Sequence, residues 1–355
     1  MDNSGLISVI IPCYNAESFV EQAVLSIMNQ TYRNLEIICL DDASTDKTLS
    51  ILESLALDDG RVSVYKNERN LGLIETLNKG ISLCKGEFIA RMDADDISLP
   101  LRFERQLSFL RKTGADVCGC YYKEMTHDGR FFMWNQRFVH HKQAMKFVGM
   151  FESPLAHPAV IAKAEVFKDN PYELTESSYV NEDYHLWCRL MNQNKTFVQV
   201  PEFLFVYRNN RMGESSSKTA IQRQNQCHCA LMQQQHAVGF NLLAEQQFLY
   251  LLNTIQDVDS KLLHDCLMRI EKIKLLFVER FEVSDLEQNE IEEWVIQRSI
   301  RVNFFALVKG DGSLRLFALK FLLSHPAWFF RKRTWLNLFY KSVWLVSGFR
   351  EKVIG

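Results

Sequence analysis

The stretch Glu87-Phe88-Ile89-Ala90-Arg91-Met92-Asp93-Ala94-Asp95-Asp96 places three carboxylates directly after an apolar run. Residues 88–92 suit a buried strand, which Arg91 interrupts. Ser98 and Pro100 then read as the cap and first turn of a helix. Neighbouring carboxylates repel one another unless a cation or hydrogen-bond donors offset their charge. The end of this strand is therefore either a site for a hard divalent cation or an acidic loop.

Two further apolar runs end in polar side chains. Residues 6–11 lead into Pro12-Cys13-Tyr14-Asn15, and residues 35–40 lead into Asp41-Asp42. Apolar runs alternate with segments of helical spacing up to about residue 122, which predicts a mostly parallel sheet with helices on both faces. The carboxyl ends of parallel strands share one edge, so we expect these polar ends to meet in one ligand-binding crevice. The expected helices cover residues 19–28, 47–56, 73–84 and 100–112, and further strands cover residues 62–65 and 116–121.

Composition limits the class of protein. The chain has 355 residues, 47% of them hydrophobic and 24% charged, with a net charge of −2. These values predict a folded protein of one large or two modest domains, without the basic character that nucleic acids attract. The nine cysteines include no Cys-x-x-Cys pair, which favours a reducing compartment and buried packing over a zinc site at residues 118–120 and 227–229. We expect no export signal and no membrane-spanning helix.

Two nucleotide-binding motifs are missing from the sequence. No Gly-x-Gly-x-x-Gly follows the first strand, and no Gly-x-x-x-x-Gly-Lys-Ser/Thr occurs. Dinucleotide-dependent dehydrogenases and P-loop NTPases therefore lose support. A nucleotide can still bind if carboxylates contact the base and ribose while a metal holds the phosphates.

Residues 6 to about 122 resemble the nucleotide-sugar-binding half of family 2 inverting glycosyltransferases with the GT-A fold, as found in bacterial surface-polysaccharide synthesis. The resemblance continues more loosely to about Arg208. The segments that carry it are Ser8-Val9-Ile10-Ile11-Pro12-Cys13-Tyr14-Asn15, Leu40-Asp41-Asp42-Ala43-Ser44-Thr45-Asp46, Asn70-Leu71-Gly72-Leu73, Leu77-Asn78-Lys79-Gly80, Ala90-Arg91-Met92-Asp93-Ala94-Asp95-Asp96, His157-Pro158 and Asn181-Glu182-Asp183-Tyr184-His185-Leu186-Trp187.

The resemblance implies a site for a nucleoside-diphosphate-sugar. Asp41 would accept a hydrogen bond from the base, with Asp42 as the alternative. Lys79 would meet phosphate or cap the carboxyl end of its own helix, and Arg208 would lie near the diphosphate. Relatives often carry a histidine two residues after that arginine, where this chain has Asn210. The implied donor-binding residues are Pro12, Tyr14, Asn15, Asp41, Asp42, Asn78, Lys79, Asp93 and Arg208.

The resemblance also implies a metal. Asp93 and Asp95 match an Asp-x-Asp pair, with Asp93 near the ribose and Asp95 on the metal. Mg²⁺ and Mn²⁺ both accept such oxygen ligands, and the sequence does not choose between them. Asp96 reads as a loop or cap residue.

The general base would come from Glu182-Asp183. We favour Asp183 over Glu182; the alternative is that both carboxylates only stabilise the start of a helix. His157 and Trp187 are the expected acceptor contacts, although His157 also suits a packing role.

The C-terminal part differs in character. We expect a GT-A domain over residues 1–220, with a nucleotide-sugar half up to about 122 and an acceptor half over 123–220. A helical region follows at 221–355, including a helix from Ser284 with Glu287 at capping-box spacing. Residues 314–348 interleave aromatic and basic side chains, which suits either an interfacial helix on an anionic leaflet or a helix pair docked on the domain. Residues 212–218 read as a mobile loop over the donor or as an ordinary surface loop.

The expected function is the inverting, metal-dependent, non-processive transfer of a hexosyl or N-acetylhexosaminyl group. The donor would be a UDP-sugar, and the acceptor a glycan or lipid-linked saccharide, as in lipopolysaccharide, capsule or exopolysaccharide synthesis. The enzyme would be cytoplasmic and peripheral on the inner face of the membrane. The alternatives are a nucleotidyl- or sugar-phosphate transferase and a degenerate sugar-binding module.

Overall fold

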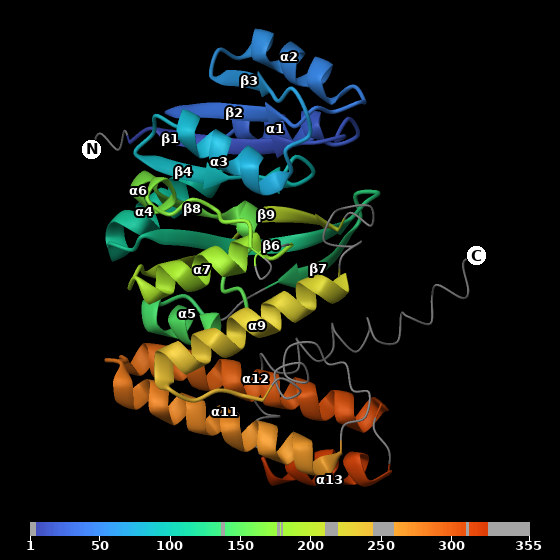
Figure 1. Cartoon of the computed structure of the whole chain (residues 1–355), viewed down its shortest axis with the longest axis vertical. Coiled ribbons are helices and arrows are strands. Elements are labelled where there is room, and N and C mark those ends of the chain that lie inside the picture. Colours follow the sequence, from blue (N-terminus) through green and yellow to red (C-terminus); the bar gives the residue numbers. More distant parts are fainter. Residues whose placement is uncertain are drawn as a thin grey trace, which may run out of the picture. The chain divides into compact units, whose positions relative to one another are not determined.

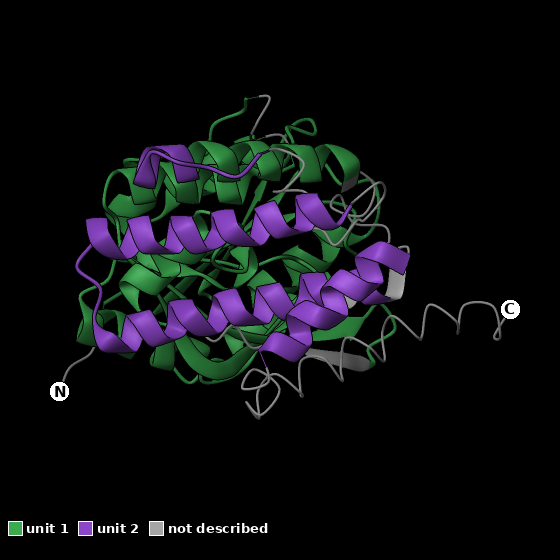
Figure 2. Cartoon of the chain, turned by 90° about the horizontal axis from the view of Figure 1, so that it is seen from below, with its two compact units in different colours: residues 1–233 green, residues 234–355 purple. Residues whose placement is uncertain are grey.

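The computed structural model describes residues 5–135, 139–175, 178, 180–209, 219–243, 259–309 and 312–325. The chain divides into two compact units, Met1–Gln233 and Gln234–Gly355 (Figure 2). The boundary expected from the sequence, between residues 220 and 221, falls at the start of α9 (Thr219–Val238), a helix that continues past the division at residue 233.

A nine-stranded sheet forms the first unit, in the order β3-β2-β1-β4-β8-β6-β9-β5, with β7 paired to β6 (Figure 1). β1 pairs in parallel with β2 and β4, β2 with β3, and β6 with β9. The other pairings, made by β5, β7 and β8, are antiparallel. The expected sheet, mostly parallel, is confirmed. The strands are β1 (Ile7–Cys13), β2 (Leu35–Asp41), β3 (Val62–Lys66), β4 (Phe88–Arg91), β5 (Ile97–Ser98), β6 (Val117–Thr126), β7 (Phe131–Asn135), β8 (Ile161–Lys163) and β9 (Phe197–Asn209).

Helices cover both faces of the parallel half. Alternate side chains of β1, from Ile7 to Ile11, share one buried apolar cluster with α1, α2 and α4. On the other face α3 comes so close that a Cβ at Gly80 would lie 2.7 Å from Ile10 and 3.0 Å from Leu40. The helices that lie wholly in this unit are α1 (Val20–Met28), α2 (Thr48–Asp58), α3 (Leu73–Leu83), α4 (Arg102–Thr113), α5 (Lys142–Gly149), the 3-10 turn η1 (His157–Ala159), α6 (Ala164–Lys168) and α7 (Glu182–Asn192).

The strand order changes direction between β1 and β4. β2 and β3 follow β1 on one side, and β4 lies on the other side. Asp41 ends β2 directly opposite Cys13 of β1, and Asp93 comes two residues after β4 ends at Arg91. The three polar strand ends therefore meet at a switch point, where open parallel sheets bind their ligands.

The prediction that Ser98 caps a helix is wrong. Ser98 lies in β5 and pairs with Phe205 of β9, and its Oγ accepts a hydrogen bond from Gln30 Nε2 at 3.1 Å. α4 begins only at Arg102. A two-residue strand leaves no periodic pattern in the sequence, so the local Ser-x-Pro signal was the stronger one.

Three long helices are described in the second unit: α11 (Ser260–Arg280), α12 (Asp285–Lys309) and α13 (Gly312–Ser324). Lys274 of α11 joins Glu292 of α12, with Nζ 2.7 Å from Oε2. The predicted capping box is present, because Ser284 N donates to Glu287 Oε2 at 3.0 Å and Ser284 Oγ accepts from Glu287 N at 3.4 Å.

Within the described ranges, no helix combines the length and apolar character needed to cross a bilayer. Residues 326–348 of the basic aromatic segment and the 212–218 loop lie outside the described residues. All nine cysteines are free and all but Cys188 are buried, in agreement with the packing explanation. Neither candidate metal-binding group found among the described residues contains a cysteine.

Candidate functional site

The loop after β1 is fastened to the loop after β2. Asn15 adopts a left-handed backbone at φ 47°, which asparagine tolerates better than most residues. Its N–H donates to Ser44 Oγ at 3.0 Å, and its Oδ1 accepts from Thr45 N at 2.9 Å. The neighbouring Tyr14 is 51% exposed. Pro12 and Cys13 thus end β1, and Tyr14 and Asn15 begin an anchored loop that leaves an aromatic ring exposed.

The two aspartates that end β2 differ in their partners. Asp42 Oδ1 accepts from Asn67 Nδ2 and Leu71 N, both at 2.8 Å, and its Oδ2 accepts from Gly72 N at 2.9 Å. Asp41 is fully buried; its Oδ2 accepts from Ser44 N at 3.3 Å, whereas its Oδ1 has no hydrogen-bond partner among the described residues. Asp42 holds a turn together, and Asp41 has a free acceptor atom.

Asn78 and Lys79 both contact protein atoms. Asn78 Nδ2 donates to Tyr172 O at 2.8 Å, and its Oδ1 accepts from Tyr172 N at 2.9 Å, so both ends of the amide are used. Asn78 thus holds the backbone at Tyr172, and its contact with the donor stays a prediction. Lys79 Nζ donates to Asn67 Oδ1 at 2.6 Å, and Asn67 in turn supports Asp42. Lys79 is thus a support of the Asp42 turn.

Arg91 and Asp93 form a bidentate ion pair. Its Nη2 lies 2.6 Å from Oδ1 of Asp93, and its Nη1 donates to Oδ2 at 2.7 Å. The Arg91 side chain is 5% exposed. Burial alone would lower the pKa of this guanidinium, but Asp93, followed by Tyr172 and Glu182, holds the pKa above its ordinary value. Sequence reasoning noted Arg91 only as an interruption, yet a charge inside an apolar strand was the available signal.

Asp93, Asp95 and Asp96 each offer a carboxylate oxygen, and these oxygens lie within 4.8 Å of one another. Asp96 is buried; its Oδ1 accepts from Arg208 N at 2.7 Å, and its Oδ2 has no hydrogen-bond partner within the part of the chain described. Burial raises the pKa of Asp96 well above its usual value, and Asp93 and Asp95 add to the rise. Asp96 therefore belongs to the carboxylate group, whereas the sequence analysis described it as a loop or cap residue.

Arg208 holds the loop that carries these carboxylates. Each of its three guanidinium nitrogens donates within the protein: Nε to Asp95 O at 2.8 Å, Nη1 to His127 O at 3.1 Å and Nη2 to Gln22 Oε1 at 2.8 Å. The resemblance implied that this side chain lies near the diphosphate. In the structure three of its five N–H donors hold the loop, and a place near the diphosphate stays a prediction.

Glu182 and Asp183 open α7, where the helix dipole favours acids. Asp183 Oδ2 accepts from Ser153 Oγ at 3.3 Å. Burial raises the pKa of Asp183 above its usual value; Glu182 adds to the rise and Arg91 opposes it. A carboxylate with a raised pKa is suited to accept a proton.

His157 and Trp187 lie behind these acids. His157 is 6% exposed and hydrogen-bonded to the Tyr172 hydroxyl, with Nε2 and the oxygen 2.6 Å apart. Burial lowers its pKa to about 3, and Arg91 contributes. Trp187 is fully buried and packs edge to face against His157 and Phe197. The prediction that Trp187 touches an acceptor is therefore wrong, and His157 has the packing role.

Electrostatic contacts join these groups into one site. Burial raises the pKa of the Cys13 thiol, and Asp41 and Asp93 are among the charges that add to the rise, so both carboxylates lie close to the end of β1. The charges of Asp93 and Asp183 both act on His157. The strand-end carboxylates and the acids of α7 therefore share one region around Arg91.

The carboxylate group fits a divalent cation. It supplies hard oxygen ligands on one loop, and the buried Oδ2 of Asp96 lacks a donor among the described residues. Arg91 pairs with Asp93, and a cation would offset the repulsion from Asp93 and Asp95 that adds to the raised pKa of Asp96. Asp95 and Asp93 would hold the cation, with Asp96 beside them.

Two other features lie away from this region. A cavity of about 300 Å³ opens at the amino end of β4, lined by Glu87, Arg111 and Lys163 among others.

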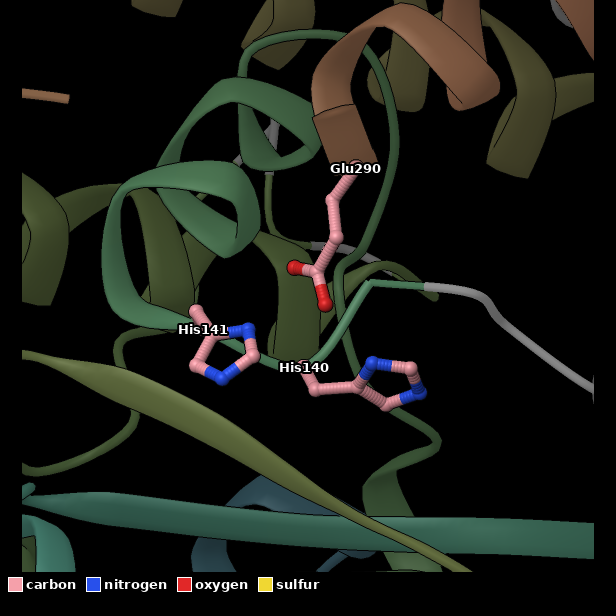
Figure 3. A group of neighbouring side chains, drawn as sticks. All are labelled: His140, His141 and Glu290. Atoms are coloured by element: carbon pink, nitrogen blue, oxygen red, sulfur yellow. The ribbon is translucent and has the colours of Figure 1, made fainter. Parts of the chain in front are cut away.

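His140 and His141 precede α5, with ring centroids 6.2 Å apart and the planes nearly perpendicular (Figure 3). His140 Nε2 is hydrogen-bonded to the hydroxyl of Tyr121. Glu290, also labelled there, belongs to α12 of the second unit.

Comparisons with known proteins find glycosyltransferases. Residues 8–170 match the model of the family described as glycosyl transferase family 2. An uncharacterized glycosyltransferase of Haemophilus influenzae is 29% identical over 326 residues, which cover 81% of this chain and 95% of that protein. The O-antigen biosynthesis glycosyltransferase WbnJ of Escherichia coli is 31% identical over 224 residues, which cover 61% of this chain and 84% of that protein.

Solved structures share the fold. Residues 1–349 of TarS from S. aureus, in complex with UDP-GlcNAc, align with a TM-score of 0.53 and 18% identity, covering 88% of each chain. The mannosyltransferase PcManGT of Pyrobaculum calidifontis, in complex with GDP-Man and Mn²⁺, aligns with a TM-score of 0.50 and 16% identity, covering 98% of this chain and 87% of that one.

Proposed function

Since this chain belongs to glycosyl transferase family 2 and is a glycosyltransferase, we propose that it transfers a sugar from a nucleoside diphosphate to a saccharide hydroxyl with inversion. The transfer depends on Mg²⁺ or Mn²⁺ and is non-processive. The acceptor is a glycan or a lipid-linked saccharide, in keeping with relatives such as WbnJ, named for O-antigen synthesis. The family assignment argues against a nucleotidyltransferase.

The nucleoside end of the donor lies over the ends of β1 and β2. The buried Oδ1 of Asp41, which has no hydrogen-bond partner among the described residues, accepts an N–H of a base that reaches the end of β2, since Asp42 is occupied by three donors. The exposed ring of Tyr14 covers the base or ribose. Uracil, like thymine, offers one ring N–H to a single carboxylate oxygen, which supports a pyrimidine carrier such as that of a UDP-sugar. Asp93, oriented by Arg91, places the ribose and diphosphate.

In the chemical step a proton leaves the acceptor hydroxyl, and negative charge builds on the diphosphate leaving group. The acceptor hydroxyl oxygen bonds to the anomeric carbon while its proton passes to Asp183, and the bond from that carbon to the diphosphate oxygen breaks with its electron pair on the leaving group. A divalent cation held by Asp95 and Asp93 would stabilise the negative charge on that leaving group as a Lewis acid. The Arg91 guanidinium keeps Asp93 in place through this change.

One observation carries the proposal: Arg91 is paired with Asp93 of the strand-end loop, and Asp93 and Asp183 both act electrostatically on His157. The buried Arg91 guanidinium thus acts on both the proposed donor-binding Asp93 and the proposed base Asp183, which supports one site for both. The experiment is a thermal-unfolding screen of the full chain with UDP-, GDP- and dTDP-sugars, each with Mn²⁺ or with EDTA. One donor should raise the melting temperature only with metal, by mass action. If no nucleotide-sugar stabilises the chain, the proposal fails.

The two aspartates at the end of β2 give a matched pair of variants. Asp41→Asn should weaken donor binding at least about tenfold, because its acceptor atom faces the base, while the melting temperature stays near that of the wild type. Asp42→Asn replaces an oxygen that accepts from Gly72 N, so it should lower the free energy of unfolding by about 1–3 kcal/mol. Calorimetric titration and thermal unfolding separate the effects. The reverse result would assign the base contact to Asp42.

The rate should depend on the protonation of Asp183. Only the ionised carboxylate accepts a proton, and its pKa is raised, so kcat/KM should fall as the pH drops through a value above that of an ordinary aspartate. The slope of log(kcat/KM) should approach about 1 on that acid limb. A profile from pH 4 to 8 tests this, and a flat profile down to pH 4 would contradict it.

Unfolding must be separated from this titration. Because the folded-state pKa of His157 is lowered to about 3, the stability held by its neutral ring is complete above about pH 6.5 and declines as the pH falls below that value. The loss is at most about 1.4 kcal/mol per pH unit. Circular dichroism at each pH of the profile shows whether the chain is folded where the rate is measured.

A further inference from the structure

α13 carries an exposed apolar stripe. Leu316, Leu319 and Leu323 are 52%, 45% and 67% exposed. At 3.6 residues per turn, these three leucines fall within about 60° of the helix circumference. The helix also has a buried side, which packs within the second unit and is formed by Leu314, Ala318 and Leu322. α13 thus has two apolar faces, one buried and one exposed.

Basic residues border this stripe on both sides. Arg315 and Lys320 are exposed, and each lies about 40° beyond the outermost leucine on its side. Residues 312–324 contain no Asp or Glu. Long basic side chains at the edges of an apolar stripe can lay their stems on it while their charges reach outward. This arrangement is typical of a helix that lies in the plane of a lipid surface.

Charge argues against a second copy of the chain as the partner. If two copies paired through this face, the basic borders of both helices would meet with no acid of α13 between them. An anionic lipid headgroup is the complementary partner for such borders. The stripe also differs from a single exposed leucine such as Leu57 of α2, which is 89% exposed and needs no partner.

We propose that the α13 face, formed by Arg315, Leu316, Leu319, Lys320 and Leu323, docks the protein on the anionic surface of a lipid bilayer. The leucines enter the boundary between headgroups and acyl chains, and the two basic residues contact lipid phosphates. This inference stands apart from the catalytic proposal, since lipid binding needs no turnover. If that proposal holds as well, the docked enzyme would meet acceptors that are linked to lipid.

Co-sedimentation of the full chain with vesicles tests the docking. The wild type should bind vesicles of phosphatidylcholine mixed with phosphatidylglycerol and should not bind pure phosphatidylcholine. The combined change Leu316→Gln, Leu319→Gln and Leu323→Gln should weaken binding at least about tenfold. The pair Arg315→Gln and Lys320→Gln should cost about fivefold per residue and flatten the dependence on salt. Leu57→Gln is the matched control and should bind as the wild type does.

Three outcomes would overturn the proposal: equal binding to both kinds of vesicle, wild-type binding by the triple variant, or a concentration-dependent dimer in gel filtration that the triple variant loses. The last outcome would make a second copy the partner. All five positions are exposed, so melting temperatures should be unchanged. If the triple variant does not fold, the Arg315 and Lys320 pair still decides, since it removes no apolar side chain.

Discussion

Asp183→Asn should abolish most of the sugar transfer and leave donor binding intact. A positioned general base contributes about 10²- to 10⁴-fold to a rate, and asparagine cannot take the proton of the acceptor hydroxyl. The amide oxygen can still accept the hydrogen bond from Ser153 Oγ, so the start of α7 should keep its structure. The measurements are kcat for transfer and the Kd of the nucleotide-sugar.

Stability gives an independent readout of the same variant. Because burial raises the pKa of Asp183, its ionised form costs folding free energy at neutral pH, and a neutral amide should unfold at the same temperature or higher. Glu182→Gln, the neighbouring acid on the same helix, is the matched control and should lose much less activity. A kcat within about threefold of the wild type in Asp183→Asn would show that another group takes the proton.

The second large effect is expected from Asp95→Asn. This change keeps the shape of the side chain and the carbonyl that accepts from Arg208 Nε, but it removes the charge that would hold a cation. Charge stabilisation of a leaving group by a bound metal is worth several kcal/mol, so transfer should fall by about 10²-fold or more. Stabilisation of the chain by Mn²⁺ together with donor should disappear.

Glu87→Gln is the control for Asp95→Asn. Glu87 precedes β4 and is exposed at its amino end, whereas Asp95 follows the carboxyl end of the same strand. Loss of a carboxylate there should change neither transfer nor stabilisation by metal. Equal responses of the wild type and Asp95→Asn to Mn²⁺ would remove Asp95 from the metal site.

The sequence predicts the sheet well because its signals are local. Buried strands leave short apolar runs, and polar residues at their ends mark the crevice. Asp41 and Asp42, by contrast, look alike in the chain. What distinguishes them is a set of donors from residues 67–72, whose positions depend on the turn after β3.

For other site residues, the place in the structure differs from the expectation because it depends on contacts between residues far apart in the chain. Arg208 reads as a phosphate contact, but it lies beside the Asp95 loop only because β9 pairs with β5. Trp187 sits one turn after the presumed base and looks available, yet α7 turns it into the core against Phe197. Arg91 forms an ion pair with Asp93, two residues away. It also interacts electrostatically with the acids of α7, some ninety residues later. No periodic pattern records such contacts.

The central claim is a division of labour between Asp95, which holds the donor through a cation, and Asp183, which takes the proton. Calorimetric titration of the stabilising nucleotide-sugar, with Mn²⁺, into the wild type, Asp95→Asn and Asp183→Asn tests it most directly. Asp183→Asn should bind the donor with a Kd near that of the wild type, and Asp95→Asn should bind at least about a hundredfold more weakly. Equal loss of binding in both variants, or in neither, would contradict the claim.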